Sequence, residues 1–409
     1  MAEPLRAPEN RWLRLLPLLY GALVFLPMLR NQFWLDDYGW VERAMDGVRH
    51  PSHLFHLSKS DFRPLANLSF ALNYLVSGLN PAGYYLFNLA LHLANTALVM
   101  RLAGRLSRGD RMVTLVTGFL FAGAFGNYGQ SVVWIAGRTG LIADLLILCA
   151  MLAHWTWLER GAGRDRARAL GFFLLALLAK ESAVILLPLL VLLDWAHGRS
   201  PRALFSARGA RDYAPFAIVL AAYLGLQFGW VRRDSVILED EYRWGWHAVT
   251  HFGEYLARML LPINPTTMMV RVPGGFDRLL MVTEQALMVL MPLAGLALLA
   301  SPAPRWVKFA VLLAGISLLP YLAFTFRTST RYLYGPSIGL SLVVAWLLAR
   351  ARAQERVRAA RPIITLALGS LLVLQAIVME VVIHQHYRMQ QAQDPALYQE
   401  LVRLRRTPS

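Results

Sequence analysis

Apolar runs long enough to cross a lipid bilayer recur along most of this chain. They lie near residues 12–29, 83–103, 112–126, 139–158, 213–231, 279–300, 307–325, 333–349 and 362–384. A bilayer core of about 30 Å requires roughly 20 apolar residues for a helical span. Because backbone groups in lipid must be bonded within the segment, spans of this length are α-helices. The sequence therefore predicts an all-α polytopic membrane protein, in keeping with 56% hydrophobic and only 16% charged residues.

One further apolar stretch, residues 169–196, is longer than a single span needs and carries Lys180 and Glu181 at its middle. Ionisable groups are costly at membrane depth. We therefore divide the stretch into two short spans that meet at this pair. The prediction is then about 11 transmembrane helices.

The distribution of charge gives the orientation. The chain has 41 Lys and Arg against 25 Asp and Glu, a net charge of +16. Arginines are concentrated in the loops after even-numbered spans, such as 101–111, 160–168, 199–211 and 350–361. The positive-inside rule places these loops in the cytoplasm. We therefore expect a cytoplasmic N-terminus and a periplasmic C-terminus in a bacterial inner membrane, and we assign the basic charge to topology and not to nucleic acid.

The rest of the organisation follows from this threading. No small-x-small cleavage site follows the first apolar run, so we expect it to be retained as a span. Two long outer loops, 30–82 and 232–278, mix tryptophans, prolines and charges in a way typical of short interfacial helices. The predicted domains are a transmembrane domain over 1–384 and a short basic tail over 385–409.

The strongest local motif is Asp36-Asp37, directly after Phe33-Trp34-Leu35 and just beyond the first span. Adjacent carboxylates beside an apolar surface are costly to ionise, because burial and mutual repulsion both oppose the charge. Such a pair can act as a general base or hold a cation. A helix N-cap or a solvated loop is the alternative interpretation.

Several cations are predicted on the same outer side as this pair. They are Arg63, Arg138 in Trp134-Ile135-Ala136-Gly137-Arg138, Lys180 beside Glu181, and Arg331 beside Tyr332. Each has a structural alternative: Lys180-Glu181 could be an ion pair between short helices, and the arginines could reach lipid headgroups. Together, cations facing a carboxylate pair suit chemistry on a phosphate-bearing substrate.

An ordered set of motifs resembles the GT-C superfamily of polytopic glycosyltransferases, and within it the transmembrane O-mannosyltransferases with tetratricopeptide repeats and their bacterial relatives. The motifs are Leu35-Asp36-Asp37-Tyr38, Phe62-Arg63-Pro64-Leu65-Ala66-Asn67, Val133-Trp134-Ile135-Ala136-Gly137-Arg138, Leu178-Ala179-Lys180-Glu181-Ser182, Leu193-Asp194-Trp195 and Arg331-Tyr332-Leu333-Tyr334-Gly335. Two features depart from the family pattern. Gly126-Asn127-Tyr128-Gly129 replaces a His-Pro-type element, and no repeats follow the last span.

The resemblance implies a GT-C-like membrane enzyme that moves a sugar from a polyprenyl-phosphate donor to an acceptor hydroxyl at the periplasmic face, with inversion. Asp36 takes the family's general-base position, and Asp37 would orient it or help hold a divalent ion. That divalent ion is the one cofactor the resemblance suggests, and the sequence does not identify the cofactor. Arg63, Arg138, Lys180, Glu181, Arg331 and Tyr332 are the expected substrate- and phosphate-binding residues.

Two alternatives remain at this point. A lipid-linked sugar flippase would also place charges near a lipid phosphate, although it would favour mid-membrane charges or repeat symmetry. Within transferases, the acceptor could be a glycolipid or polysaccharide and not a protein. The expected partners are therefore the polyprenyl-phosphate sugar, a protein or glycolipid acceptor, and membrane lipids.

Overall fold

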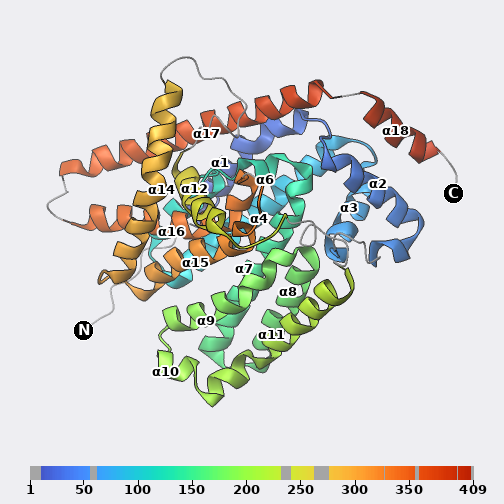
Figure 1. Ribbon diagram of the computed structural model, residues 1–409. Helices are drawn as coiled ribbons and strands as arrows, with labels where there is room; N and C mark the ends of the chain where they lie inside the picture. The colour runs from blue at the N-terminus through green and yellow to red at the C-terminus, as the bar shows by residue number, and fades with distance from the viewer. Residues whose placement is uncertain are drawn as a thin grey trace.

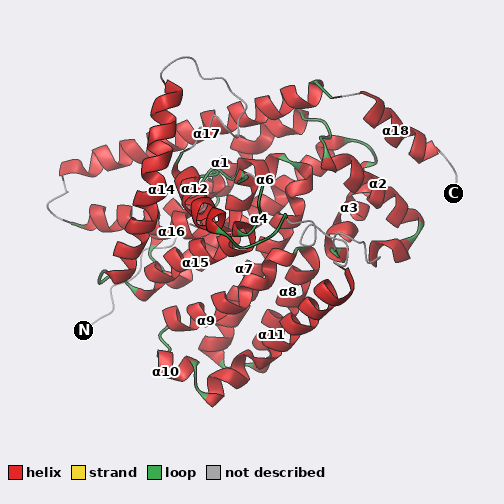
Figure 2. Ribbon diagram, viewed as in Figure 1, coloured by secondary structure: helices red, strands yellow, loops and turns green. Residues whose placement is uncertain are grey.

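The computed structural model describes residues 11–55, 62–231, 241–261, 276–326, 328–354, 359–393 and 395–406. Within these ranges the regular structure is helical, apart from one isolated antiparallel bridge between Tyr242 and Phe324 (Figure 2). Seven helical stretches of the described chain are long and apolar enough to cross a membrane: Trp12–Arg30, Pro81–Leu106, Ile135–Arg160, Arg278–Ala300, Arg305–Leu322, Thr330–Ala353 and Arg361–Gln391. The all-α polytopic class is confirmed and the chain is an integral membrane protein, but the count of eleven spans is not confirmed.

The helices follow one another through the whole described chain. The first group is α1 (Leu16–Phe25), α2 (Asp36–Arg49), α3 (Pro64–Ser77), α4 (Pro81–Leu106), α5 (Arg111–Ala122), α6 (Gly129–Val133), α7 (Arg138–Arg160) and α8 (Gly163–Ala179). The second group is α9 (Leu186–His197), α10 (Pro201–Leu204), α11 (Ala207–Leu226), α12 (Trp246–Leu260), α14 (Phe276–Ala300), α15 (Arg305–Leu322), α16 (Tyr334–Ala353), α17 (Arg361–Gln391) and α18 (Pro395–Arg406). Short 3-10 turns include η2 (Leu26–Arg30), η4 (Ile135–Gly137), η5 (Glu181–Ile185) and η7 (Thr330–Leu333).

Helix α7 is the centre of the packing. It lies along α8 and α4, while α15 packs against α16 and α9 (Figure 1). The core includes the aromatic side chains Tyr84, Tyr85, Phe70 and Phe173, all fully buried. Large aromatic side chains bury much apolar surface each, so they fix how neighbouring helices pack.

The predicted break inside residues 169–196 is present. Helix α8 ends at Ala179, η5 follows, and α9 begins at Leu186. Between α8 and η5 the backbone of Lys180 is extended, with φ −161° and ψ 139°. The break turns Lys180 and Glu181 out of the helical repeat and toward the site described below.

The predicted outer loops contain short helices where the structure describes them. Loop 30–82 contains α2 and α3, and the described part of loop 232–278 contains α12; residues 232–240 and 262–275 lie outside the described residues. The predicted domain boundary at 384 falls inside α17, which continues to Gln391. Beyond it, α18 lies beside α2 (Figure 1).

Candidate active site

A cavity of about 240 Å³ brings together residues from distant parts of the sequence. All of the predicted site residues except Asp37 and Arg138 line it: Asp36, Arg63, Lys180, Glu181, Arg331 and Tyr332. Trp134, Asp144, Ser182 and Tyr321 complete much of the wall. The cavity therefore combines three carboxyl side chains, three cations and aromatic rings in one polar pocket.

Asp36 enters the cavity from the first residue of α2. The residue before it, Leu35, has φ 46° and ψ −115°, a backbone conformation that an L side chain rarely adopts. Strain of this kind persists only where neighbouring contacts hold it, and it clusters at functional sites. Asp36 directly follows this strained turn and lines the cavity.

Asp37 is fully buried beneath its neighbour and does not line the cavity. Its Oδ2 accepts from the Trp34 amide at 2.9 Å, and its Oδ1 accepts from the Ala136 amide at 2.8 Å. Burial raises the pKa of Asp37 to about 8; the Asp36 charge adds to this shift, and the two amide hydrogen bonds and Arg138 oppose it. The group therefore holds a proton at neutral pH, so no second full negative charge lies beside Asp36.

The three cavity cations differ in how they are held. Arg63 makes a bidentate pair with Glu181, with Nε–Oε2 and Nη2–Oε1 distances of 2.9 and 2.7 Å. The Lys180 ammonium lies 5.6 Å from the centre of the Tyr332 ring. Arg331 donates from Nη2 to the Tyr332 hydroxyl at 2.9 Å, and its buried Nε has no hydrogen-bond partner in the described chain. Arg331 and Lys180 therefore keep donor capacity for an anion.

Arg138 lies outside the cavity, fully buried among α3, α4 and α7. Its guanidinium donates to Asn88 Oδ1 at 3.0 Å, to Asn73 Oδ1 at 2.6 Å and to the Tyr84 carbonyl at 3.0 Å. The Phe70 ring lies 4.3 Å from its centre. Through Asn88, which donates to the Trp134 carbonyl, these contacts connect Arg138 to the turn that carries Trp134 and Ala136.

Asp144 is a cavity residue that the sequence analysis missed. It lies on α7 inside an apolar run, and a lone ionisable residue in a span is itself a functional signal. Gly335 leaves room for this crowded polar floor, and Gly140 lies beside it. A Cβ on Gly335 would lie 3.2 Å from Asp144 Oδ1, and one on Gly140 would lie 3.6 Å from Lys180 Nζ.

The described residues contain no group of three or more His, Cys, Asp or Glu side chains placed to hold a metal ion. Both Asp37 oxygens are bonded to backbone amides, so Asp37 does not offer an oxygen to an ion in the cavity.

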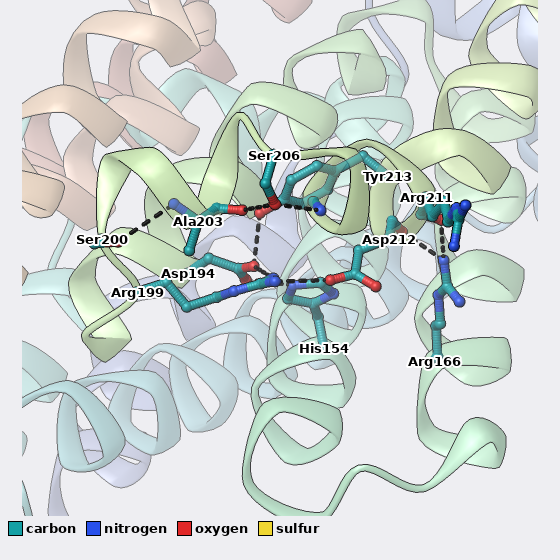
Figure 3. Close-up of polar contacts among 11 residues, drawn as sticks. His154, Arg166, Asp194, Arg199, Ser200, Ala203, Ser206, Arg211, Asp212 and Tyr213 are labelled. Carbon is teal, nitrogen blue, oxygen red and sulfur yellow. Dashed lines mark hydrogen bonds and ion pairs between the residues drawn. The ribbon is translucent and has the colours of Figure 1, made fainter.

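A second buried polar cluster surrounds Asp194 on α9 (Figure 3). Asp194 accepts from Arg199 Nη1 at 2.7 Å and from the Tyr213 hydroxyl at 2.6 Å, and lies 2.6 Å from His154 Nε2. Arg199 also bonds Asp212 at 2.8 Å. None of these residues lines the cavity. The cluster joins α7, α9 and α11 and accounts structurally for the Leu193-Asp194-Trp195 motif.

Known proteins match this chain in sequence. No protein-family model matches. The protein O-mannosyl-transferase Tmtc1 of Drosophila melanogaster is 33% identical over 42% of this chain, and Tmtc2 of the same organism is 38% identical over 35%. Human TMTC2 is 33% identical over 33%. These matches span 18%, 16% and 17% of the relatives' lengths, so the chain spans less than a fifth of the length of these curated relatives.

The fold has a solved neighbour. The apo crystal structure of the Archaeoglobus fulgidus oligosaccharyltransferase superposes with a TM-score of 0.53 at 12% identity, covering 98% of this chain and 60% of that one. At this identity the likeness is one of fold alone, and it confirms the GT-C-like architecture. With the sequence matches, it confirms the resemblance to GT-C glycosyltransferases and to the transmembrane O-mannosyltransferases.

Proposed function

We propose that this chain is an inverting GT-C glycosyltransferase that moves a sugar from a polyprenyl-phosphate donor to an acceptor hydroxyl at the periplasmic face. The single observation that carries the proposal is the cavity that Asp36 lines together with Lys180 and Arg331. The sequence relatives, which are O-mannosyltransferases by name, support the reaction class.

In this mechanism the Asp36 carboxylate takes the proton of the acceptor hydroxyl as that oxygen attacks the anomeric carbon. The bond from the anomeric carbon to the phosphate oxygen breaks, and the lipid phosphate leaves with the electron pair. Attack from the side opposite the phosphate inverts the carbon. A positioned base typically contributes 10²–10⁴-fold to rate.

The leaving phosphate gains charge in the transition state, and preorganised cations are most effective where charge develops. We assign this role to Lys180 and to Arg331, whose buried Nε has no hydrogen-bond partner among the described residues. The Arg63–Glu181 ion pair would form another part of the cavity wall, where the Glu181 carboxylate balances the positive charge of Arg63. Asp37 and Arg138 would act indirectly, by holding the backbone around the site in place.

The acceptor is a protein hydroxyl in this proposal, with a glycolipid as the alternative. The test is a transfer assay in nanodiscs with purified protein, polyprenyl-phosphate sugar, and both peptide and glycolipid acceptors. Mass spectrometry of envelope proteins and glycolipids from cells with and without the protein identifies the natural product. Labelled acceptor is the expected result. Movement of the donor lipid across vesicles with no transfer to any acceptor would instead identify a flippase.

A further inference from the structure

The turn that carries Asp36 is held by the far end of the chain. Residues 31–35 link η2 to α2 as irregular backbone and include the strained Leu35. Irregular backbone makes no regular ladder of hydrogen bonds, so its polar groups need other partners. Two glutamines near the end of the described chain supply several of them.

Gln390, in the last turn of α17, is the stronger contact. Its Oε1 accepts from the Gln32 amide at 2.7 Å, and its Nε2 donates to the Tyr85 hydroxyl at 3.0 Å. That hydroxyl in turn donates to the Gln32 carbonyl at 2.8 Å. Gln390 is 6% exposed, and its bond to the Tyr85 hydroxyl is buried. The result is a closed ring of hydrogen bonds around Gln32.

Gln393 and His386 extend this contact toward Asp36. Gln393 donates from Nε2 to the Phe33 carbonyl at 3.2 Å and accepts from the Leu35 amide at 3.4 Å. The buried His386 ring meets Trp34 edge-on, with 4.4 Å between ring centres. Every residue from Gln32 to Leu35 is therefore touched by the segment 386–393.

Helix α18 fixes that segment from its other end. Arg49 at the end of α2 donates from Nη2 to the Leu404 carbonyl at 2.7 Å, and Leu401 is buried. The C-terminal segment thus contacts the turn before α2 and, through α18, α2 itself, the helix that begins with Asp36 (Figure 1).

We infer that Gln390 and Gln393 are positioning residues for Asp36: they hold the turn Gln32–Leu35 in the strained conformation that aims the base into the cavity. The inference rests on the proposed function for Asp36. Neither glutamine lines the cavity, and the cations assigned to the phosphate lie on other elements. Loss of the glutamines should therefore slow the chemical step and leave donor binding unchanged.

The test compares Gln390→Met and Gln393→Met, which keep an unbranched chain of similar volume and remove the amide. Gln391→Met is the matched control, because Gln391 is the exposed neighbour on the same helix end. We expect kcat to fall about tenfold in Gln390→Met and less in Gln393→Met, since misplacing a catalytic group by 1 Å can cost about 10²-fold. Donor KM should stay within about twofold, and Gln391→Met should match the parent.

Hydrogen exchange gives a readout that needs no activity. The amides of residues 32–37 should exchange faster in both variants than in the parent. In Gln391→Met their exchange rates should equal those of the parent. Parent-like exchange together with parent-like kcat in the two variants would overturn the inference; if Gln390→Met does not fold, Gln393→Met alone decides it by the same criteria. Absence of transfer by the parent protein would count against the proposed function, while the exchange result would still decide whether the glutamines hold the turn.

Discussion

Asp37 Oδ1 accepts a 2.8 Å hydrogen bond from the backbone amide of Ala136, joining the start of α2 to the turn before α7. Asn88 holds the same turn by donating to the Trp134 carbonyl at 3.0 Å. Arg138 in turn donates a hydrogen bond to Asn88. Asp37 is thus the buried link between the strained turn that presents Asp36 and the wall of the cavity.

The buried Asp37 predicts a pH dependence of stability. Its pKa is raised by burial from an ordinary value near 4 to about 8, so between these pH values the folded state binds more protons than the unfolded state. Stability therefore falls as pH rises through this window, by up to about 1.4 kcal/mol per pH unit. Asp37→Asn should flatten this part of the pH profile of thermal unfolding. An unchanged slope in the variant would contradict the assignment.

Arg138 should matter for folding more than for donor binding. Replacing it with Met leaves Asn73, Asn88 and the Tyr84 carbonyl without their buried donor, at about 1–3 kcal/mol for each unsatisfied group. We expect a loss of about 3 kcal/mol or more in unfolding free energy, with Arg138→Lys intermediate. Donor affinity of the folded fraction should stay near the parent value; a stable variant that has lost donor binding would instead place Arg138 on the phosphate.

Lys180 and Arg331 should show the opposite pattern. A charge-assisted hydrogen bond contributes about 1.5–3 kcal/mol, or roughly one to two decades in affinity. Lys180→Gln and Arg331→Gln should therefore weaken binding of a polyprenyl-phosphate sugar by that factor, measured in nanodiscs. Arg111→Gln, at an exposed position at the start of α5, is the control. Parent-like binding in both cavity variants would remove them from the phosphate site.

The predicted orientation can be checked by labelling. Ser52 lies in the short 3-10 helix η3 (Pro51–Phe55) on the predicted outer side, and Ser107 follows α4 on the predicted cytoplasmic side. In a Cys149→Ser background, a single cysteine at Ser52 should react with an impermeant thiol reagent in intact spheroplasts, and one at Ser107 should not. Reaction of the cysteine at position 107, but not of the one at position 52, would show that the orientation is opposite to the predicted one.

Sequence patterns predict some parts of this molecule well, because their causes are local. Hydropathy indicates apolar helices, and the charged pair Lys180-Glu181 inside an apolar stretch indicates a break between two of them. The motif residues Asp36, Arg63 and Arg331 could be placed in one site because their resemblance to a family supplied the long-range relationship.

Other features depend on contacts that leave no local pattern. An arginine after a short turn has the same sequence signature whether it faces a cavity or, like Arg138, an internal cage of asparagines. Gln390 and Gln32 are separated by 358 residues, so nothing near either predicts their hydrogen bond. Asp144 did carry a sequence signal, because it is a single acidic residue within a predicted span, and this signal is sufficient to predict it as a site residue.

The most direct test of the central claim compares donor binding with sugar transfer in Asp36→Asn. The substitution is nearly isosteric, and it removes only the ability to accept a proton. We predict that the variant binds the polyprenyl-phosphate sugar as the parent does and transfers it 10²–10⁴-fold more slowly, both measured in the same nanodisc samples. Near-parent transfer by Asp36→Asn with a verified donor and acceptor would contradict its role as the base.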